Sequence, residues 1–345
     1  MDTGTRTAVL GAGYWGANLI RVLHNTDGIW LKAVCDPRPA VLQEIKTHYP
    51  HVALTASWQS VLDDQHLDAV VLATPPATHY QLARAALAAG KHTWVEKPLA
   101  LHYAEGQELV ALARAHRRVL FVDETFLYDP LVQQVRTKIA AGELGTIVHV
   151  SLERTGMGRI RRDSNVWWNS APHDLSVLRY VLDTSAVRIA ANGHAFLQPG
   201  IEDVVWAALQ LDGGISAHVY LNWLFPEKKA SLMVIGERGM LGYEGRFEQR
   251  ALTHYAYRLG HIAGTAPEDV SQANLIPIEK SEVVECIQGE RTEPLLLACA
   301  AFRDSILSGV PAPSSGESSV RTLAVLEAGA HSLTQHGAWT ECGAI

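Results

Sequence analysis

The chain is poor in cysteine and has no long apolar run. Its 345 residues contain four cysteines, Cys35, Cys286, Cys299 and Cys342, and none of them forms a CxxC pair or a metal-ligand spacing with histidine. We therefore expect reduced structural thiols, without a disulfide framework or a zinc site. No apolar stretch approaches the roughly eighteen residues of a membrane span, and no basic and apolar leader precedes the first expected strand. These absences predict a cytoplasmic protein.

The chain also has fewer positively than negatively charged residues: it contains 29 Lys and Arg and 36 Asp and Glu residues, which gives a formal net charge of -7. This balance disfavours nucleic acid or an anionic membrane surface as a partner. None of the 16 histidines stands in an HExxH motif, and the His48 and His51 pair has no acidic partners, so we expect no metal site. A hydrophobic content of 48% and a charged content of 19% are typical of a globular protein.

Three glycines follow the first expected strand. Residues 7–16 read TAVLGAGYWG, and a helical pattern follows in residues 17–23. Gly11 lets the chain turn sharply, Gly13 lets backbone approach a pyrophosphate, and Gly16 lets the helix pack closely on the sheet. The helix N-terminus offers N–H groups and partial positive charge to phosphates. We expect the following residues of this turn to bind a dinucleotide: Gly11, Gly13, Tyr14, Trp15 and Gly16.

The residues after the second expected strand bear on the choice of dinucleotide. The strand at residues 30–35 ends in Asp36, twenty residues beyond Gly16, where a carboxylate accepts hydrogen bonds from both ribose hydroxyls and repels a 2′-phosphate. We therefore expect NAD. Arg38 keeps NADP open as the alternative, because its guanidinium could pair with that phosphate or merely cover the adenine. An ordinary βαβ unit without a cofactor is the plain structural alternative.

The first third of the chain alternates short apolar strands with amphipathic helices. The stretch DAVVLA at residues 68–73 is continuously apolar, as in strands buried on both faces of a parallel sheet. This pattern predicts a doubly wound, Rossmann-type α/β domain over residues 1–123. The other elements expected in it are strands at residues 93–95 and 119–122 and helices at residues 81–89 and 104–115.

The pattern changes after Glu124. Pro130 opens a helix that is expected to end at Gly142, and the stretches that follow have strand character, with Asp-Gly-Gly at residues 212–214 as hairpin punctuation. We expect a second, α+β domain over residues 124–345, a mostly antiparallel open sheet with helices on one face. Its open face is predicted to make a homodimer or homotetramer, and its C-terminal helices are free to pack back on the first domain. The expected strands are residues 147–153, 187–196, 204–211, 215–223, 230–235 and 240–244, and the last helices residues 294–308 and 319–335.

Polar residues follow three strands of the first domain, where open α/β sheets bind their ligands. The segment TPPATH at residues 74–79 is made rigid by its prolines and is suited to lie along a nicotinamide ribose. Glu96-Lys97-Pro98 follows the next strand, and Asp123-Glu124 the one after it. A lysine that is paired with Glu96 on the surface is the plain alternative for Lys97. Further cofactor-binding residues are therefore expected at Thr74, Pro75, His79, Glu96 and Lys97.

Motifs at residues 11–16, 74–79 and 96–98 resemble those of the Gfo/Idh/MocA family, which includes glucose-fructose oxidoreductase and inositol dehydrogenase. The resemblance covers nearly the whole chain, and so many motifs in family order do not arise by chance. It implies NAD(P)-dependent oxidation or reduction of a sugar or cyclitol at a secondary alcohol. The further motifs are TFLY at residues 125–128, GELG at 142–145, PHD at 172–174 and EPL at 293–295.

The resemblance implies two catalytic residues. In the family the lysine of EKP binds the reacting hydroxyl and the histidine of a DxxxH segment is the acid/base, which here correspond to Lys97 and His173. A histidine titrates near neutrality and an ammonium stabilises a developing alkoxide, so the chemistry agrees. From the residues alone, His173 could equally be a helix-start residue that is satisfied by local backbone. The family's aspartate is replaced by Asn169, which we expect to orient the substrate by hydrogen bonds.

The substrate is expected to be a nucleotide-linked sugar. Residues 154–168 concentrate arginines and two tryptophans within an acidic protein, and guanidinium forks suit phosphate while an indole face suits a base or sugar ring. A solvated loop with a core tryptophan is the plain alternative. The stretch resembles the family branch that oxidises C3 of UDP-N-acetylglucosamine or its uronate, whose ketone a partner transaminase then aminates. The expected substrate-binding residues are Tyr128, Arg154, Arg159, Arg161, Asn165, Trp168, Asn169 and His173.

UDP-N-acetylglucosamine is the first expected substrate, since no motif separates the amide sugar from the uronate. An inositol or free-sugar dehydrogenase is the enzyme alternative. A non-catalytic NAD-binding regulatory protein is an alternative of another class, for which the replacement at Asn169 leaves room and against which Lys97 and His173 argue.

Overall fold

The computed structural model covers residues 1–345 and describes residues 4–158, 160–246, 249–259, 278–287, 289 and 292–343. The chain divides into two compact units. The first unit consists of Met1–Asp129, Thr292–Ala328 and Gly343–Ile345, and the second of Pro130–Arg291 and Gly329–Cys342. In the described part of the chain, no helix is long and apolar enough to cross a membrane.

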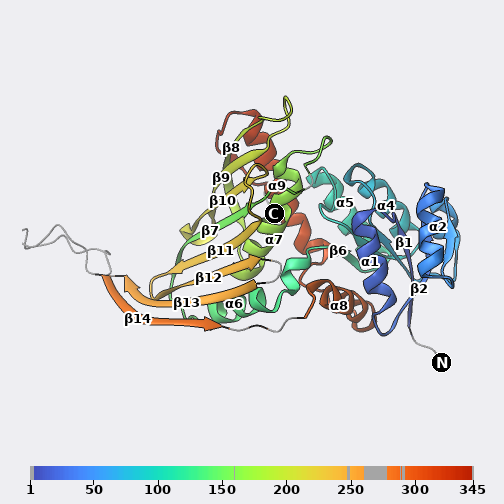
Figure 1. Ribbon diagram of the computed structural model, residues 1–345, viewed down its shortest axis with the longest axis horizontal. Coiled ribbons are helices and arrows are strands. Elements are labelled where there is room, and N and C mark those ends of the chain that lie inside the picture. Colours follow the sequence, from blue (N-terminus) through green and yellow to red (C-terminus); the bar gives the residue numbers. More distant parts are fainter. Residues whose placement is uncertain are drawn as a thin grey trace, which may run out of the picture. The chain divides into compact units, whose positions relative to one another are not determined.

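The first unit contains a parallel sheet of six strands among its described residues, in the order β3-β2-β1-β4-β5-β6 (Figure 1). This order is that of a doubly wound dinucleotide-binding sheet, and it confirms the predicted Rossmann fold. The strands are β1 (Thr5–Leu10), β2 (Ile29–Cys35), β3 (Ala53–Thr55), β4 (Ala69–Leu72), β5 (His92–Val95) and β6 (Leu120–Val122).

Helices connect these strands, as the alternating pattern predicts, and two more come from the C-terminal part of the chain. The last helix begins in the first unit and ends in the second. The helices are α1 (Tyr14–His24), α2 (Pro39–His48), α3 (Trp58–Asp63), α4 (His79–Ala88), α5 (Tyr103–Ala115), α8 (Pro294–Ser308) and α9 (Gly316–Thr334), with short 3-10 turns η1 (Pro76–Thr78) and η2 (Thr125–Tyr128).

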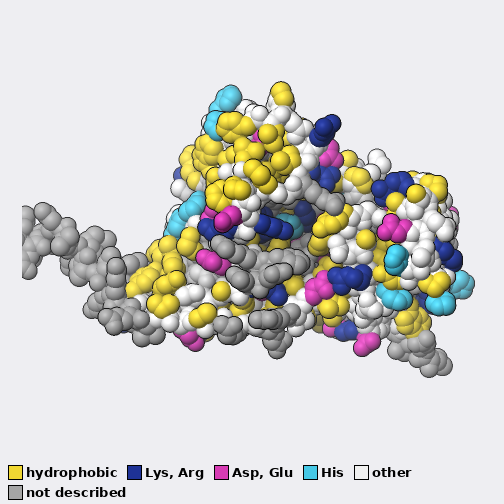
Figure 2. Space-filling view, viewed as in Figure 1, with side chains coloured by type: hydrophobic (Ala, Val, Ile, Leu, Met, Phe, Trp, Pro, Cys, Tyr) yellow, Lys and Arg dark blue, Asp and Glu magenta, His cyan; other side chains and the backbone are white. Residues whose placement is uncertain are grey.

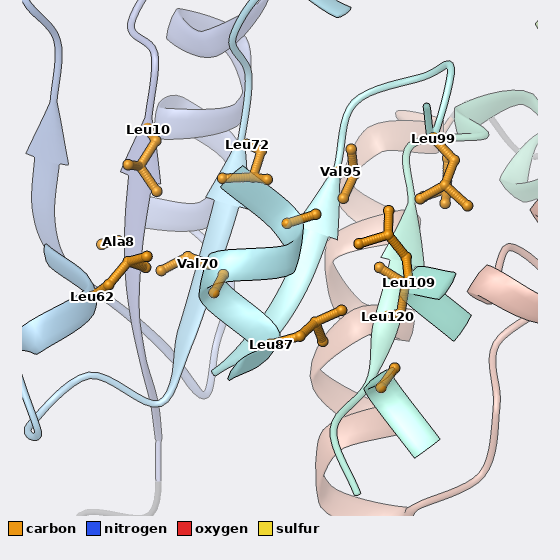
Figure 3. Close-up of a cluster of buried hydrophobic side chains, with 14 of the residues drawn as sticks. Ala8, Leu10, Leu62, Val70, Leu72, Leu87, Val95, Leu99, Leu109 and Leu120 are labelled. Atoms are coloured by element: carbon orange, nitrogen blue, oxygen red, sulfur yellow. The ribbon is translucent and has the colours of Figure 1, made fainter. Parts of the chain in front are cut away.

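The core of the first unit lies between this sheet and its helices. Leu72 of β4 is fully buried, and Leu87 of α4 and Leu109 of α5 pack in the same cluster (Figure 3). Burial of such side chains contributes about 1.5–3 kcal/mol each. On α8, Phe302 packs edge-on against Trp94 of β5 with ring centroids 5.4 Å apart, so this C-terminal helix belongs to the first unit's core.

The second unit contains a sheet with the described strand order β14-β13-β12-β11-β7-β10-β9-β8-β15. Its pairs are antiparallel except for β7 and β10, which run parallel, so the prediction of a mostly antiparallel sheet is confirmed. The strands are β7 (Ile147–Thr155), β8 (Ala186–His194), β9 (Val204–Leu211), β10 (Ser216–Asn222), β11 (Lys229–Gly236), β12 (Gly239–Arg246), β13 (Gln249–Leu259), β14 (Ile278–Ile287) and β15 (Thr340–Glu341).

Helices α6 (Pro130–Ala140) and α7 (Val166–Leu182) cover one face of this sheet (Figure 1). The Asp-Gly-Gly punctuation forms the 3-10 turn η3 (Asp212–Gly214), which joins the antiparallel strands β9 and β10 as predicted. The sequence pattern did not reveal α7, because α7 is buried over most of its circumference and contains Pro172. A helix that is buried on nearly all sides, with polar residues such as Ser170 and Asp174 among its buried positions, lacks the amphipathic period by which helices are recognised.

Candidate active site

The glycine turn leaves open space where a pyrophosphate would bind. Gly11 has φ +93°, and a Cβ there would lie 2.6 Å from the carbonyl oxygen of Ala73, while a Cβ on Gly16 would collide with the carbonyl oxygen of Gly11. At Gly13 the nearest atom to an added Cβ is 3.9 Å away, on Arg38. Two glycines therefore pack the turn, and the third keeps one side free, which fits a dinucleotide.

The start of α1 faces this turn. The helix begins at Tyr14, Gly13 is its N-cap, and no side chain of the described residues caps it. The N–H groups of a first helical turn have no partners within the helix, so here they can donate to a phosphate. Tyr14 is 66% exposed, whereas the indole of Trp15 is anchored by a hydrogen bond, described below.

Asp36 follows β2 and is 2% exposed. Its carboxylate accepts hydrogen bonds from the backbone of Ala12 at 2.9 Å and from the backbone and guanidinium of Arg38 at 3.0, 2.8 and 2.7 Å. The side-chain bonds from Arg38 are the main cause that lowers the pKa of Asp36 to about 2, against its burial. Asp36 is thus an anion at neutral pH, which suits ribose hydroxyls and repels a 2′-phosphate. Arg38 is engaged with this carboxylate.

His79 joins two of the predicted cofactor loops. Its ring is fully buried, and its Nδ1 and Nε2 atoms lie 2.7 Å and 2.9 Å from the backbone carbonyl oxygens of Pro98 and Thr74. Burial lowers the pKa of His79, while the two carbonyl partners act in the opposite direction. We predicted that His79 binds the cofactor, but a buried ring offers no surface to a ligand. His79 instead holds the segment that follows β4 against the segment that follows β5.

Two carboxyl groups follow the neighbouring strands β5 and β6. Val95 pairs with Val122, so Glu96 and Asp123 occupy equivalent positions at the same sheet edge. Asp123 is 1% exposed and accepts a hydrogen bond from the indole Nε1 of Trp15 at 2.7 Å. The predicted cofactor residue Trp15 is therefore tied to the end of β6. Asp123 was noted at a strand end and was not predicted to belong to the site, although it follows β6 as Glu96 follows β5.

Lys97, the first predicted catalytic residue, comes directly after Glu96 and is partly buried. Its charge acts on Glu96, whose pKa it lowers, but the larger effects of burial and of Asp123 raise the pKa of Glu96 well above its ordinary value.

In the second unit, α7 carries the other predicted catalytic residue. Asn165 caps the helix: its side chain accepts a hydrogen bond from the backbone of Trp168 at 3.1 Å, and its amide donates to Glu202 at 2.6 Å. Asn169 and His173 are four residues apart within the helix and so lie on the same side of it. The interpretation of His173 as a helix-start residue is wrong, because it lies in the middle of α7. Trp168, Asn169 and His173 are partly exposed on a helix that is otherwise mostly buried.

The predicted substrate-binding arginines are held by carboxylates where they are described. Arg154 of β7 donates two hydrogen bonds to Asp174 of α7, at 3.0 and 2.9 Å. Arg161 donates two to Asp163, each at 2.8 Å. Arg159 lies outside the described residues.

Tyr128, the remaining predicted substrate residue, is buried in the first unit. Its hydroxyl lies 2.7 Å from that of Ser314, and burial raises the pKa of Tyr128. Lys97 and Tyr128 thus belong to the first unit, and the α7 residues to the second. Among the described residues, no group of three or more His, Cys, Asp or Glu side chains is arranged to hold a metal ion.

Comparison with known proteins places the chain in a family. Residues 5–124 match the oxidoreductase family model with an NAD-binding Rossmann fold, GFO_IDH_MocA, and residues 132–242 match the GFO/IDH/MocA C-terminal domain. An uncharacterized oxidoreductase of Bacillus subtilis, YrbE, is 24% identical over 247 residues, which are 70% of each chain. An inositol 2-dehydrogenase of Acidothermus cellulolyticus is 26% identical over 64% of this chain and 67% of its own.

Among solved structures, UDP-N-acetylglucosamine 3-dehydrogenase GnnA from Acidithiobacillus ferrooxidans superposes with a TM-score of 0.81 over 96% of this chain and 98% of its own, at 22% identity. At that identity the similarity concerns the fold. The two matched models together span most of the chain, and the glycine turn, the anionic Asp36 and the strand-end lysine fit them. The protein therefore belongs to the Gfo/Idh/MocA family of NAD-dependent oxidoreductases and is a dehydrogenase that acts on alcohols.

Proposed function

We propose that this dehydrogenase oxidises the C3 hydroxyl of a nucleotide-linked sugar, with UDP-N-acetylglucosamine as the first candidate. The observation that carries the proposal is the partly exposed side of α7, where an indole, an amide and an imidazole follow one another along the helix at Trp168, Asn169 and His173. An indole face suits a sugar ring or base, and the amide can bond to hydroxyls. The similarity of fold to a UDP-N-acetylglucosamine 3-dehydrogenase supports the choice.

The proposed roles follow from the chemistry of the two candidate catalytic residues. NAD, when bound, accepts a hydride from the carbinol carbon. The hydroxyl proton needs an acceptor that titrates near neutrality, and His173 supplies it. The ammonium of Lys97 stabilises the negative charge that develops on the oxygen. Asn169 stands where the family has an aspartate, so it orients the substrate by hydrogen bonds and does not share the proton.

More than one arginine of residues 154–165 is a candidate to bind the phosphates of the nucleotide. Arg161 is partly exposed and bonded to Asp163 two residues away, an arrangement that an incoming diphosphate could exchange for its own oxygens. Arg154 is more deeply buried, and its pairing with Asp174 joins β7 to α7. We therefore assign phosphate binding to Arg161 before Arg154.

A parallel turnover assay tests the proposal. The protein is incubated with NAD and, separately, UDP-N-acetylglucosamine, UDP-N-acetylglucosaminuronate and myo-inositol, while an added transaminase removes the ketone. NADH formation with UDP-N-acetylglucosamine is expected to exceed that with myo-inositol by at least about tenfold in kcat/KM. A preference for the uronate would retain the reaction and change the sugar. A preference for myo-inositol would contradict the proposal.

An inositol or free-sugar dehydrogenase is the second candidate, and the inositol 2-dehydrogenase among the relatives favours it. Thermal unfolding separates the two, because a ligand that binds only the folded state raises Tm. Millimolar UDP is expected to raise Tm if the substrate is nucleotide-linked. An unchanged Tm with UDP, together with an increase with myo-inositol, would favour the second candidate.

A further inference from the structure

The two carboxyl groups at the ends of β5 and β6 hydrogen-bond to each other. Glu96 and Asp123 directly follow Val95 and Val122, which pair in the parallel register of β5 and β6, so the two carboxyl groups start from neighbouring positions at the same sheet edge. A side-chain hydrogen bond between them contributes to the raised pKa of Glu96. Two ionised carboxylates are acceptors only, so a hydrogen bond between them requires one proton on the pair. The pair must therefore carry a single negative charge when this bond is formed, as carboxyl pairs in other buried sites do.

The surroundings assign that proton to Glu96. Asp123 accepts from the indole N–H of Trp15 at 2.7 Å and from the hydroxyl of Thr125 at 2.5 Å, one donor on each carboxylate oxygen. Donors of this kind stabilise the ionised form of the group that accepts them. Glu96 is the partly buried partner beside this carboxylate, and the ammonium of Lys97 acts in the opposite direction on its pKa. The titratable and charged groups that interact with the pair are Lys97, which acts on Glu96, and Tyr128 and Cys299, which interact with Asp123.

The pair lies in the half of the sheet that would bind the nicotinamide in a doubly wound dinucleotide-binding fold. In the strand order β3-β2-β1-β4-β5-β6, Asp36 at the end of β2 marks the adenosine half, so β4 to β6 form the second mononucleotide-binding half. Trp15, in the first turn of α1, connects the carboxyl pair to the glycine turn. Oxidised nicotinamide carries a positive charge and reduced nicotinamide is neutral, so the two forms act differently on a nearby carboxyl proton.

We propose that Glu96 is a proton-holding residue of the cofactor site: it shares one proton with Asp123 in the cofactor-free protein, releases it to solvent when NAD+ binds, and keeps it when NADH binds. A reduced ring is neutral, so with NADH in the site the pair would hold a proton taken from solvent. The inference concerns cofactor binding alone. It therefore stands or fails independently of the sugar proposed above.

Calorimetric titration in buffers of different ionisation enthalpy counts the protons released per cofactor bound. At neutral pH the wild-type protein is expected to release close to one proton more with NAD+ than with NADH. Glu96→Gln, whose amide can still donate to Asp123, is expected to abolish this difference, counted per molecule of cofactor bound. Glu44→Gln, an exposed change on α2, is the matched control and should behave as wild type.

Infrared difference spectra of the wild-type protein give a readout that does not depend on any variant. Addition of NAD+ is expected to remove the carbonyl stretch of a protonated carboxyl group, and addition of NADH is expected to leave it. Equal proton release for the two cofactors, an unchanged carbonyl band with NAD+, or a full difference that persists in Glu96→Gln would each overturn the proposal.

Discussion

We propose that a single buried charge, at Asp36, governs which ribose the cofactor site accepts. The carboxylate is almost fully shielded from solvent, and its ionisation is secured by the Arg38 guanidinium and two backbone N–H groups. Hydrogen bonds to a charged group contribute about 1.5–3 kcal/mol each, enough to decide between two cofactors that differ by one phosphate. Arg38 forms an ion pair with Asp36, and in this proposal it would become a phosphate ligand only if Asp36 were removed.

Replacement of Asp36 tests this interpretation. Asp36→Ser is expected to weaken NAD binding by about 2 kcal/mol, about thirtyfold in Kd, and to raise affinity for NADP because Arg38 is released. Fluorescence titration with both cofactors measures the two constants. Arg38→Ala, which leaves the carboxylate in place, should keep the preference for NAD. An unchanged NAD-to-NADP ratio in Asp36→Ser would show that cofactor choice lies elsewhere.

Lys97 is expected to act on turnover and not on cofactor affinity. Loss of the ammonium in Lys97→Ala removes stabilisation of the developing alkoxide, so kcat at saturating substrate should fall about a hundredfold while the Kd for NAD changes less than about threefold. Steady-state kinetics and NAD titration measure the two effects, with the exposed Lys46→Ala as control. A fall in rate of less than tenfold would refute the assignment.

At the scale of elements, His92 extends the pairing of β5 with β6. Its Nδ1 atom accepts the backbone N–H of Val119 at 3.0 Å, just before the strand register that begins with Thr93 opposite Leu120. Acceptance of an N–H requires a neutral ring nitrogen. Burial, assisted by Arg118, lowers the pKa of His92 to about 4. Protonation of His92 at Nδ1 would therefore remove the hydrogen bond to Val119 that extends the pairing of β5 with β6.

This coupling predicts a pH dependence of stability. Between about pH 6.5 and pH 4 the unfolded chain binds a proton at His92 that the folded protein does not, so the free energy of unfolding decreases as the pH falls, by on the order of 2 kcal/mol. His92→Asn keeps an acceptor and removes the titration, so its loss of stability over this window should be smaller than in wild type. Urea unfolding of both proteins at pH 6.5 and pH 4.5 measures the difference, and equal losses would contradict it.

At the scale of the whole molecule, the uncovered face of the nine-stranded sheet among the described residues predicts self-association. An apolar row crosses four strands there, because Ile235 pairs with Met240, Met240 with Tyr255 and Tyr255 with Val284. Tyr255 and Val284 are 39% and 56% exposed. Hydrophobic side chains are also seen over the strands of this sheet in Figure 2. Large exposed apolar patches mark protein–protein interfaces.

We propose that two copies of the chain associate through this face, as a dimer or within a tetramer. The double variant Met233→Lys and Tyr255→Lys places charges on β11 and β13 and is expected to yield monomers, because burial of unpaired charge is costly. Light scattering coupled to size-exclusion chromatography measures the mass. Leu307→Lys, at a more exposed apolar position on α8, is the control. A monomeric wild type, or an oligomeric double variant, would refute the proposal.

Local rules made the first unit the more predictable half. Each signal of this unit lies within a few residues of the chain: a glycine at the sharp turn of Gly11, a continuous apolar strand at β4 and a carboxylate just after β2. The Rossmann fold and its preference for NAD could therefore be inferred from the sequence alone. The hairpin at η3 and the boundaries of β9 and α8 followed from the same local patterns. Helix α7 was not predicted, because its burial over most of its circumference removes the periodic pattern of apolar and polar residues.

The sequence by itself therefore determined the fold class, the cofactor turn and the identity of the candidate catalytic lysine and histidine. Only the tertiary structure decided the electrostatics of the site. It paired Glu96 with Asp123 and Asp123 with Trp15, and it engaged Arg154 with Asp174. The reason is physical: charge and hydrogen bonding act through space between neighbouring strands and helices, and partners that are 20 to 108 residues apart leave no periodic trace along the chain.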